Sequence, residues 1–202
     1  SQKSEVGKAV LETDLIAIAV FPKDFEGLAL QLAQLILKRS EEKPNIPLNI
    51  ILCTNLVHAG PIFKNYLRKN LDAEQINYFD NYIGVVESLV IRIAPNAPEE
   101  EIQKDPLIVW TNGFMEFPVE KHAFKGLLPA LPSLRFVEDM RAEEKRKMYT
   151  YNMCHAVLSY PGYQKGYTLL VDCLADPELR NEAEGALDEV NRALQKEYGF
   201  TE

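Results

Sequence analysis

The sequence predicts an α/β protein, with a partial parallel sheet in its first half and a mainly helical domain after it. Two observations predict the sheet. LIAIAV (15–20) and LNIILC (48–53) are short, continuous apolar runs with β-branched residues, a pattern typical of buried strands in parallel sheets. FEGLALQLAQLILKRSEE (25–42) lies between them and carries apolar residues at helical spacing. The order strand–helix–strand predicts one right-handed βαβ unit.

The rest of the first half adds a helix and two strands. A helix is expected around 62–71, and strands at 84–95 and 106–111 flank an acidic, solvated loop. From about Phe117 the pattern changes, because prolines punctuate an irregular stretch and helical periodicity then dominates. We therefore expect an α/β part ending at Glu116 and an all-helical part after it.

Three helical segments are predicted in the second part. One long helix or two abutting helices cover 138–160 and end at Tyr160-Pro161-Gly162, since proline and glycine stop helices. A shorter helix is expected at 166–176. The last, 177–200, is amphipathic, with an apolar stripe on one side and charges on the other.

Composition excludes several classes of function. The 202 residues carry a net charge of −8 and no basic stripe, so nucleic acid is not an expected partner. The apolar run 15–21 is far shorter than the roughly 20 residues that span a bilayer, so no membrane partner is expected. Three widely spaced cysteines without a CxxC favour a reducing compartment, and we expect a cytoplasmic protein.

The segment KMYTYNMCHAVLSY (147–160) combines an apolar helix with three polar groups. Lys147, Asn152 and His155 follow the pattern K-x4-N-x2-H and can share one helix face. Burying such groups without partners costs free energy, which is explained if the face lines a polar cleft. The alternative is that His155 is a satisfied core residue and Lys147 a surface residue, and spacing alone leaves both interpretations open.

A second polar segment follows the second predicted strand. TNLVHAGP (54–61) places Asn55, Leu56 and His58 at the carboxyl end of that strand, where open α/β sheets bind ligands. The histidines and cysteines show no metal-ligand spacing, so no metal site is expected.

These segments resemble a known family. KMYTYNMCHAVLSY is similar to the active-site helix of the mannitol dehydrogenase family, the polyol-specific long-chain dehydrogenases, and CTNLVHAG resembles its strand-end motif. The similarity continues through IGVVESLVIRIAP and FPVEKHAFKGLLPALPSL and covers nearly the whole chain. PLNIILCTN and FKGLLPALP are most similar to mannitol-1-phosphate 5-dehydrogenases.

The resemblance implies a fold and a reaction. Residues 1–116 would be the C-terminal part of a Rossmann-like dinucleotide-binding domain, and 117–202 the start of a helical substrate and catalytic domain. The reaction would be metal-independent hydride transfer between NAD and a polyol phosphate or ketose phosphate, such as mannitol 1-phosphate and fructose 6-phosphate. NAD and NADP are not distinguished, and homo-oligomerisation is left open.

The resemblance also assigns catalytic roles. Lys147 would be the general base for alcohol oxidation, Asn55 and Asn152 would donate hydrogen bonds to the reacting oxygen, and His155 would orient substrate hydroxyls. A lysine in an apolar helix should have a lowered pKa, because desolvation disfavours the ammonium form. A base near neutrality suits proton abstraction from an alcohol.

Binding residues are expected at two places. Ala19, Val20 and Asn55 would contact the cofactor at the carboxyl ends of the strands. Arg92 and Lys125 are the candidate cations for a substrate phosphate. The alternatives are strand-edge pairing for Arg92 and surface solvation for Lys125.

Two departures from the family pattern support a second hypothesis. No G-x-G occurs in the chain, so we expect it to begin inside the dinucleotide-binding domain, to end before the family's further helices, and to bind NAD weakly alone. Ile91 stands where the family usually has an acidic residue. The alternative is therefore a truncated or inactive relative that acts as a non-catalytic association module.

Overall fold

The computed structural model describes residues 2–201, with side chains from Glu5 onward. The chain forms two compact units, one up to Met140 and one from Arg141. The change of character predicted at 116/117 falls inside the first unit.

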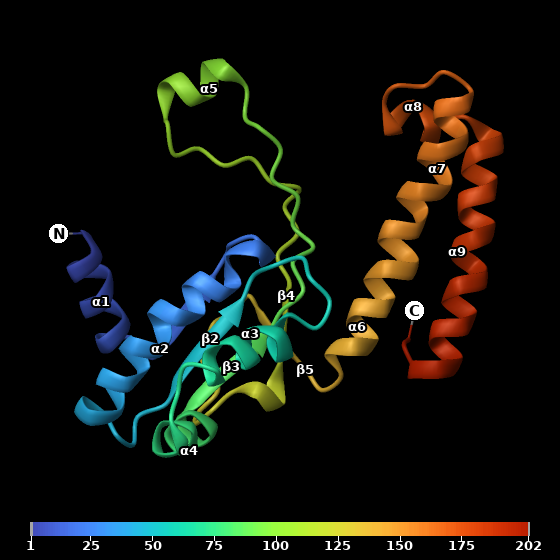
Figure 1. The fold of residues 1–202 in the computed structure, drawn as a ribbon. Helices are drawn as coiled ribbons and strands as arrows, with labels where there is room; N and C mark the ends of the chain where they lie inside the picture. The colour runs from blue at the N-terminus through green and yellow to red at the C-terminus, as the bar shows by residue number, and fades with distance from the viewer. Residues whose placement is uncertain (1, 202) are drawn as a thin grey trace. The chain divides into compact units, whose positions relative to one another are not determined.

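The first unit is built on a three-stranded parallel sheet of order β1-β2-β3. Figure 1 shows helices α2 and α3 beside these strands. The elements in chain order are α1 (Gln2–Glu12), β1 (Leu15–Ile18), η1 (Pro22–Asp24), α2 (Phe25–Glu42), β2 (Leu48–Leu52), α3 (Ala59–Arg68), α4 (Ala73–Tyr82), β3 (Ile83–Glu87), α5 (Glu99–Lys104), β4 (Phe117–Glu120), η2 (Lys121–Ala123) and β5 (Leu134–Val137).

Both faces of the sheet are covered, which explains why its strands are continuously apolar. Every residue of β2 and β3 is buried. Ile50 and Leu52 belong to the core formed with α2 and α3, where the Phe25 and Phe63 rings meet edge to face at 5.0 Å. Ile51, the intervening residue, points to the opposite face. There the core is completed by residues from the other end of the unit, including Val86, Val119 and Phe124.

The predicted βαβ unit is confirmed. The strands at 15–20 and 48–53 form β1 and β2, which pair in parallel with Ile16 opposite Ile50. The helix at 25–42 coincides with α2. The helix expected at 62–71 is α3, shifted toward the N-terminus.

Three expectations about strands were wrong. The strand predicted at 84–95 ends at Glu87, and no strand forms at 106–111, where Leu107 is 87% exposed. An apolar run becomes a strand only beside a partner that completes its hydrogen bonds. The part predicted to be all-helical contains β4 and β5, which pair in parallel with Val119 opposite Phe136.

Residues 90–116 form an excursion between β3 and β4, and α5 lies at its far end (Figure 1). Its two limbs are joined where the guanidinium of Arg92 donates to the carbonyl of Phe114, at 2.9 Å from Nε and 2.6 Å from Nη2. Asn112 N–H also donates to the carbonyl of Ile93 at 3.2 Å. The excursion is thus closed at its base by polar contacts.

Buried polar side chains fix the amino end of the sheet. The Arg39 side chain has no exposed area and donates to the carbonyls of Leu11 at 2.8 Å and Pro47 at 3.2 Å. It also pairs with Asp14 at 3.0 Å. One side chain therefore ties α1, α2 and the entry to β2 together.

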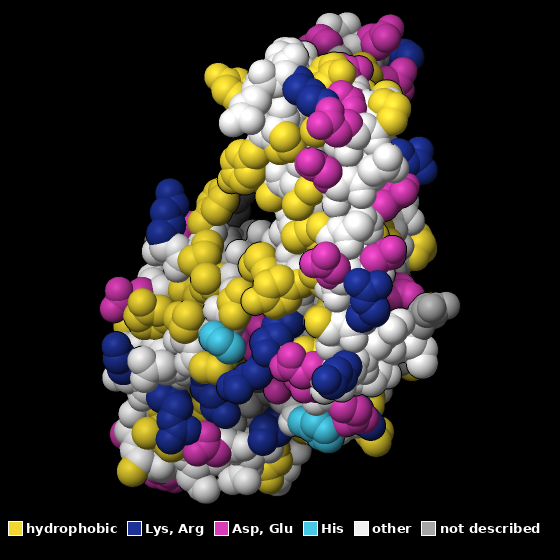
Figure 2. Space-filling model, turned by 90° about the vertical axis from the view of Figure 1, so that its right-hand side faces the viewer, with side chains coloured by type: hydrophobic (Ala, Val, Ile, Leu, Met, Phe, Trp, Pro, Cys, Tyr) yellow, Lys and Arg dark blue, Asp and Glu magenta, His cyan; other side chains and the backbone are white. Residues whose placement is uncertain are grey.

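The second unit is helical, with a π-helical turn between two α-helices. Its elements are α6 (Met140–Lys147), the π-turn η3 (Met148–Asn152), α7 (Met153–Gln164), α8 (Leu170–Ala175) and α9 (Pro177–Tyr198). Leu158, Cys173, Leu179 and Ala183 form the core shared by α7, α8 and α9. Charged side chains of both signs are spread over the side of the molecule shown in Figure 2, which is viewed from α9.

Helix α7 does not end at Tyr160, as the sequence suggested, but runs through Pro161 to Gln164. The proline forgoes one helical hydrogen bond, while the residue after it packs tightly. A Cβ on Gly162 would lie 2.3 Å from Cys173 Sγ, so a glycine is needed where α7 meets α8. The expected helix at 166–176 begins only at Leu170.

The start of α9 is defined by a side-chain cap. Asp176 accepts hydrogen bonds from the N–H groups of Glu178 and Leu179, and Pro177 occupies the first helical position. Among the helices in residues 2–201, none combines the length and apolar character that crossing a membrane requires.

Candidate functional site

The carboxyl edge of the β1–β2 pair brings three of the predicted residues together. The backbone N–H of Cys53 donates to the carbonyl of Ile18 at 2.7 Å, which continues the ladder past both strands. The Thr54 hydroxyl donates to the carbonyl of Val20 at 3.0 Å. Ala19 and Val20 thus run beside the segment that leads to Asn55, and both Ala19 and Asn55 are exposed.

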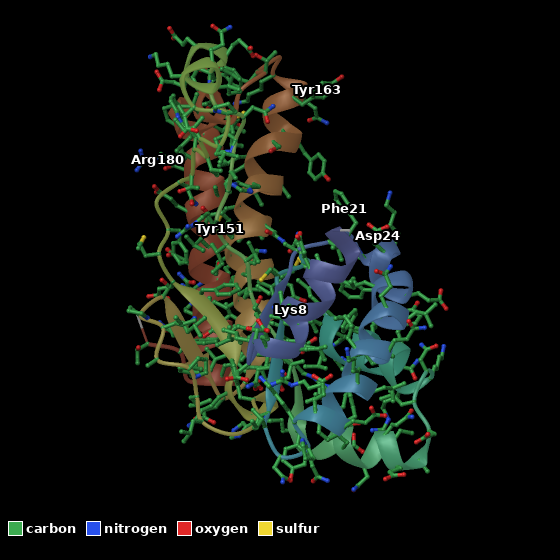
Figure 3. The ribbon with its side chains drawn as sticks, turned by 90° about the vertical axis from the view of Figure 1, so that its left-hand side faces the viewer. Lys8, Phe21, Asp24, Tyr151, Tyr163 and Arg180 are labelled. Atoms are coloured by element: carbon green, nitrogen blue, oxygen red, sulfur yellow. The ribbon has the colours of Figure 1, made fainter. Side chains whose placement is uncertain are left out.

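The same edge continues past these residues on both sides. Phe21 follows Val20, and its ring is 73% exposed (Figure 3). On the β3 side, the Ser88 hydroxyl donates to the carbonyl of Leu52 at 2.7 Å. The ends of all three strands are therefore linked by hydroxyl-to-carbonyl or backbone hydrogen bonds.

The segment CTNLVHAG passes from this edge into α3. His58 has a φ of 59°, the left-handed region, and is the only non-glycine residue with positive φ among those that the structure describes. Histidine is among the residues that tolerate this conformation best. Gly60 N–H then donates to Glu87 Oε1 at 2.8 Å, which anchors the start of α3 to the end of β3.

The Glu87 carboxylate has a second neighbour, which is the carboxylate of Glu120. Burial and the charge of Glu87 raise the pKa of Glu120, while His122 and Lys64 lower it. The pair joins β3 to β4, since Glu87 ends the one strand and Glu120 the other.

In the second unit, Lys147, Asn152 and His155 lie on one continuous helical segment. Lys147 is the last residue of α6, Asn152 ends the π-turn, and His155 is in the first turn of α7. The π-turn is marked by the N–H of Met153, which donates to the carbonyl of Met148 five residues earlier. The sequence did not predict this turn.

The side chains of this segment have defined surroundings. Partial burial lowers the pKa of Lys147, as expected from sequence. Asn152 Nδ2 lies 3.6 Å from Met148 Sδ, and the Tyr151 and His155 rings meet edge to face with centroids 5.3 Å apart. The amine, amide and imidazole are thus held on a segment of known conformation.

The apolar composition of 147–160 suggested a helix made for burial, and that is wrong for several of its apolar side chains. Met148 is 46% exposed, Tyr149 51% and Tyr160 76%. Figure 3 shows Tyr151 on the π-turn and Tyr163 farther along α7. Leu158 is the residue of 147–160 that the core with α9 buries.

Lys125 is not brought to the carboxyl edge with Asn55, whereas Arg92 follows β3 beyond its carboxyl end. Arg92 donates to Phe114 at the base of the excursion. Lys125 is held through its backbone to Asn49, at the amino end of β2, whereas Asn55 follows the carboxyl end. Ile91 packs against the apolar cluster of Leu89, Val137 and Met140.

Sequence reasoning missed the hydroxyls that hold these segments. Thr54 and Ser88 link strand ends, and Thr150 donates to the carbonyl of Arg146 at 2.7 Å within the helix. A hydroxyl directly after an apolar strand, or inside an apolar helix, is the signal that could have found them. Across residues 2–201 no three His, Cys, Asp or Glu side chains gather as a metal site.

Comparison with protein families assigns both parts of the chain. The model of the mannitol dehydrogenase Rossmann domain matches residues 1–133, and that of the mannitol dehydrogenase C-terminal domain matches residues 139–201. The chain belongs to the mannitol dehydrogenase family. The resemblance drawn from the active-site helix and the strand-end motif is thereby confirmed, as is the fold class.

Two solved structures share this fold. D-sorbitol dehydrogenase in substrate-free form superposes with a TM-score of 0.78 at 19% identity, over 92% of this chain and 46% of that one. Pseudomonas fluorescens mannitol 2-dehydrogenase, in ternary complex with NAD and D-mannitol, gives 0.68 at 17% identity, over 92% and 46%. The chain spans about half the length of these proteins.

Proposed function

We propose that this protein is an NAD-dependent dehydrogenase that interconverts a polyol phosphate and a ketose phosphate, with mannitol 1-phosphate and fructose 6-phosphate as substrates. The observation that carries the proposal is the Lys147 amine, whose pKa is lowered, on the same helical segment as Asn152 and His155. That segment lies in the part of the chain matched by the family's C-terminal domain.

The carboxyl edge of β1 and β2 fits the nicotinamide end of NAD. Ala19 is exposed and has a small side chain, so a flat ring can approach the backbone there, and Asn55 offers an amide beside it. NAD supplies the acceptor or donor of the hydride when bound. Ala19, Val20 and Asn55 are therefore the proposed cofactor contacts, and the pyrophosphate has no Gly-rich turn in these 202 residues.

Lys147 is the proposed general base. A neutral amine accepts the proton of the substrate hydroxyl during oxidation, and the ammonium returns it to the carbonyl oxygen during reduction. Desolvation favours the neutral form, which is what proton abstraction needs. The lysine needs no metal to perform this step.

Asn152 and His155 act on the same substrate. The Asn152 amide donates a hydrogen bond to the oxygen that carries developing negative charge, which lowers the barrier. His155 orients substrate hydroxyls. Asn55 belongs to the first unit. Its proposed role, which the family resemblance implies, is to donate a hydrogen bond to the substrate oxygen.

The substrate class needs a direct comparison. The two solved relatives are named for free polyols, D-sorbitol and mannitol, whereas the segments PLNIILCTN and FKGLLPALP favour the phosphorylated class. Arg92, which follows the carboxyl end of β3, is the first proposed phosphate contact, and Lys125, held at the amino end of β2, is the second candidate. The odd number of cysteines supports a cytoplasmic location.

NADH absorbance with fructose 6-phosphate, and in parallel with fructose, tests the proposal. We expect NADH to be oxidised with fructose 6-phosphate and not with fructose. Lys147→Ala should lower kcat at least about 100-fold, the usual contribution of a general acid or base. The matched control is Lys145→Ala, two residues earlier, whose amine pairs with Glu197. Unchanged turnover in Lys147→Ala would disprove the role of the lysine.

A second function, as a non-catalytic association module, is favoured by Ile91. This isoleucine packs against an apolar cluster and stands where the family usually has an acidic residue. Calorimetric titration with NADH separates the two functions. Failure to bind NADH even in the complete gene product would support the association module, whereas measurable reduction of either sugar excludes this function.

A further inference from the structure

In a regular α-helix, the spacing K-x4-N-x2-H would spread its three side chains widely. Residues turn by about 100° each, so Lys147 and Asn152, five apart, would point about 140° from each other. His155 would lie between them, about 80° from Lys147. Such a spread covers more than a third of the helix circumference, too wide for three groups that act on one carbon atom.

The π-turn changes this relation. Its hydrogen bond joins Met153 N–H to the carbonyl of Met148, so one turn holds one more residue than an α-turn does. Lys147 and Asn152 therefore take the relative orientation of residues four apart, about 40°. Lys147 and His155 take that of residues seven apart, about 20° on the other side. The three side chains then span about 60° instead of about 140°.

Thr150 stands in the middle of the turn and bonds backward. Its hydroxyl donates to the carbonyl of Arg146 at 2.7 Å. In an α-helix that carbonyl accepts from the N–H of residue 150, so the hydroxyl competes for the acceptor on which the α-helical pattern depends. Back-bonding of this kind is known to distort helices.

The Thr150 side chain lies on the side of its helical segment that is directed toward α9. With Arg146 it lines a hollow of about 640 Å³ whose other walls include Asn191, Leu194 and Gln195 of α9. It is half-buried there, and its hydroxyl is already engaged with Arg146. The Thr150 hydroxyl is thus placed to act on the helix backbone, through the carbonyl of Arg146.

We propose that the π-helical turn Met148–Asn152 gathers Lys147, Asn152 and His155 on one helix face, and that Thr150 is a positioning residue that holds the turn through Arg146. The inference rests on the proposed function, because it explains how that function's three groups come to act together. Without the turn, the amine and the amide point to different sides of the helix.

Two substitutions at Thr150 isolate the hydroxyl. Thr150→Val keeps the size and the β-branch but removes the donor, whereas Thr150→Ser keeps the donor. Thr150→Val is expected to lower kcat about 10- to 100-fold, the effect of a catalytic group displaced by about 1 Å, with KM for NADH unchanged. The limb of the pH–rate profile that reports Lys147 should also shift. Thr150→Ser is expected to restore both to the values of the natural protein.

Crystal structures of both variants test the turn independently of activity. The proposal requires the Met153-to-Met148 hydrogen bond in Thr150→Ser and its replacement by a bond to Tyr149 in Thr150→Val. A π-turn that persists in Thr150→Val overturns the inference. So does a Thr150→Val enzyme with the natural kcat and pH profile.

The design separates this inference from the proposed function. If Lys147→Ala is inactive and Thr150→Val behaves as the natural protein, the general base stands and the positioning role fails. If Lys147→Ala keeps full activity, the proposed role of Lys147 as the general base fails, and the crystal structures still decide whether Thr150 holds the turn.

Discussion

Asn49 and Lys125 are joined by two hydrogen bonds that imitate a strand pair. Asn49 Nδ2 donates to the Lys125 carbonyl at 3.1 Å, and the Lys125 N–H donates to Asn49 Oδ1 at 2.8 Å. The side chain of one residue in β2 thus satisfies the backbone of another, 76 positions away. It fastens the segment after β4 to the face of the sheet that this segment covers.

Replacement of Asn49 by Ala should destabilise the first unit by about 2–4 kcal/mol. Two hydrogen bonds are lost, and the Lys125 backbone groups are left without partners in a partly buried place. Urea unfolding followed by circular dichroism measures the change. Asn70→Ala is the control, since its exposed amide only caps its own helix and the variant should stay within about 0.5 kcal/mol. An equal loss in both variants would contradict the role of the Asn49 pair.

A matched pair of glycine substitutions tests the same contact from the other side. A Cβ on Gly84 would lie 2.2 Å from Asn49 Oδ1 and 2.7 Å from the Ala123 carbonyl, so Gly84→Ala should cost about 1–3 kcal/mol. Gly27, in α2, has nothing within 4 Å of such a Cβ. Gly27→Ala should instead stabilise by about 0.5–1 kcal/mol, because alanine favours the helix. Thermal melts of the two variants should move in opposite directions.

The pH dependence of turnover should report Lys147. Only the neutral amine accepts a proton, so the rate of polyol oxidation should rise as pH increases through the lowered pKa of this lysine. Ketose reduction needs the ammonium form and should fall over the same interval. Both profiles are measured by NADH absorbance at saturating substrate. Profiles in which this limb lies at the pKa of an ordinary lysine would mean that desolvation does not act on the catalytic base.

Stability should depend on pH through Glu120. Burial first, and then the charge of Glu87, raise the pKa of Glu120, so the folded protein binds the proton more tightly than the unfolded chain does. Stability is then lost as pH rises from the unfolded pKa of glutamate through the raised folded value.

The variant Glu120→Gln should remove this part of the pH dependence and be more stable than the natural protein near neutral pH. Urea midpoints from about pH 4 to about 7, a range that runs upward from the unfolded glutamate pKa of about 4.3, measure it. Identical slopes for the variant and the natural protein would show that the carboxylate pair does not titrate as described.

The sequence predicted the elements whose pattern is long and continuous. The range 25–42 coincides with α2 because its apolar stripe, first residue and last charged turn all agree. β2 was found because it is buried on both faces, which removes any alternation. β1 was found because its sequence is equally apolar, although only Ile18 of its four residues is buried. The carboxyl edge followed from that order, and the structure brings Ala19, Val20 and Asn55 to it.

Other elements could not be predicted, for physical reasons. β4 and β5 have four residues each, and β4 contains Pro118, so local preference argues against both strands. They exist because Val119 completes a core formed by residues of the distant β2 and β3. The run at 106–111 is apolar enough for a strand but has no strand beside it, and a single sequence does not show which partners will be present.

The π-turn was also not predicted, for a different reason. Its residues, MYTYN, suit an α-helix as well as a π-turn, so hydrophobic periodicity does not distinguish the two. The spacing of five and then three residues in K-x4-N-x2-H was visible and was interpreted as one broad face of an α-helix, about 140° wide, which the π-turn narrows to about 60°.

The tight contact between Gly162 and Cys173 makes the Cys173 thiol a natural probe of how often the helical unit opens. Cys173 is 3% exposed and its sulfur sits where any larger residue at 162 would be, so a thiol reagent reaches it only when α7 and α8 separate. The rate at which this single thiol is labelled therefore counts the openings of the unit. Cys53 and Cys154 are only partly buried, so a thiol reagent should label them before it labels Cys173, and they give the labelling rate that needs no opening.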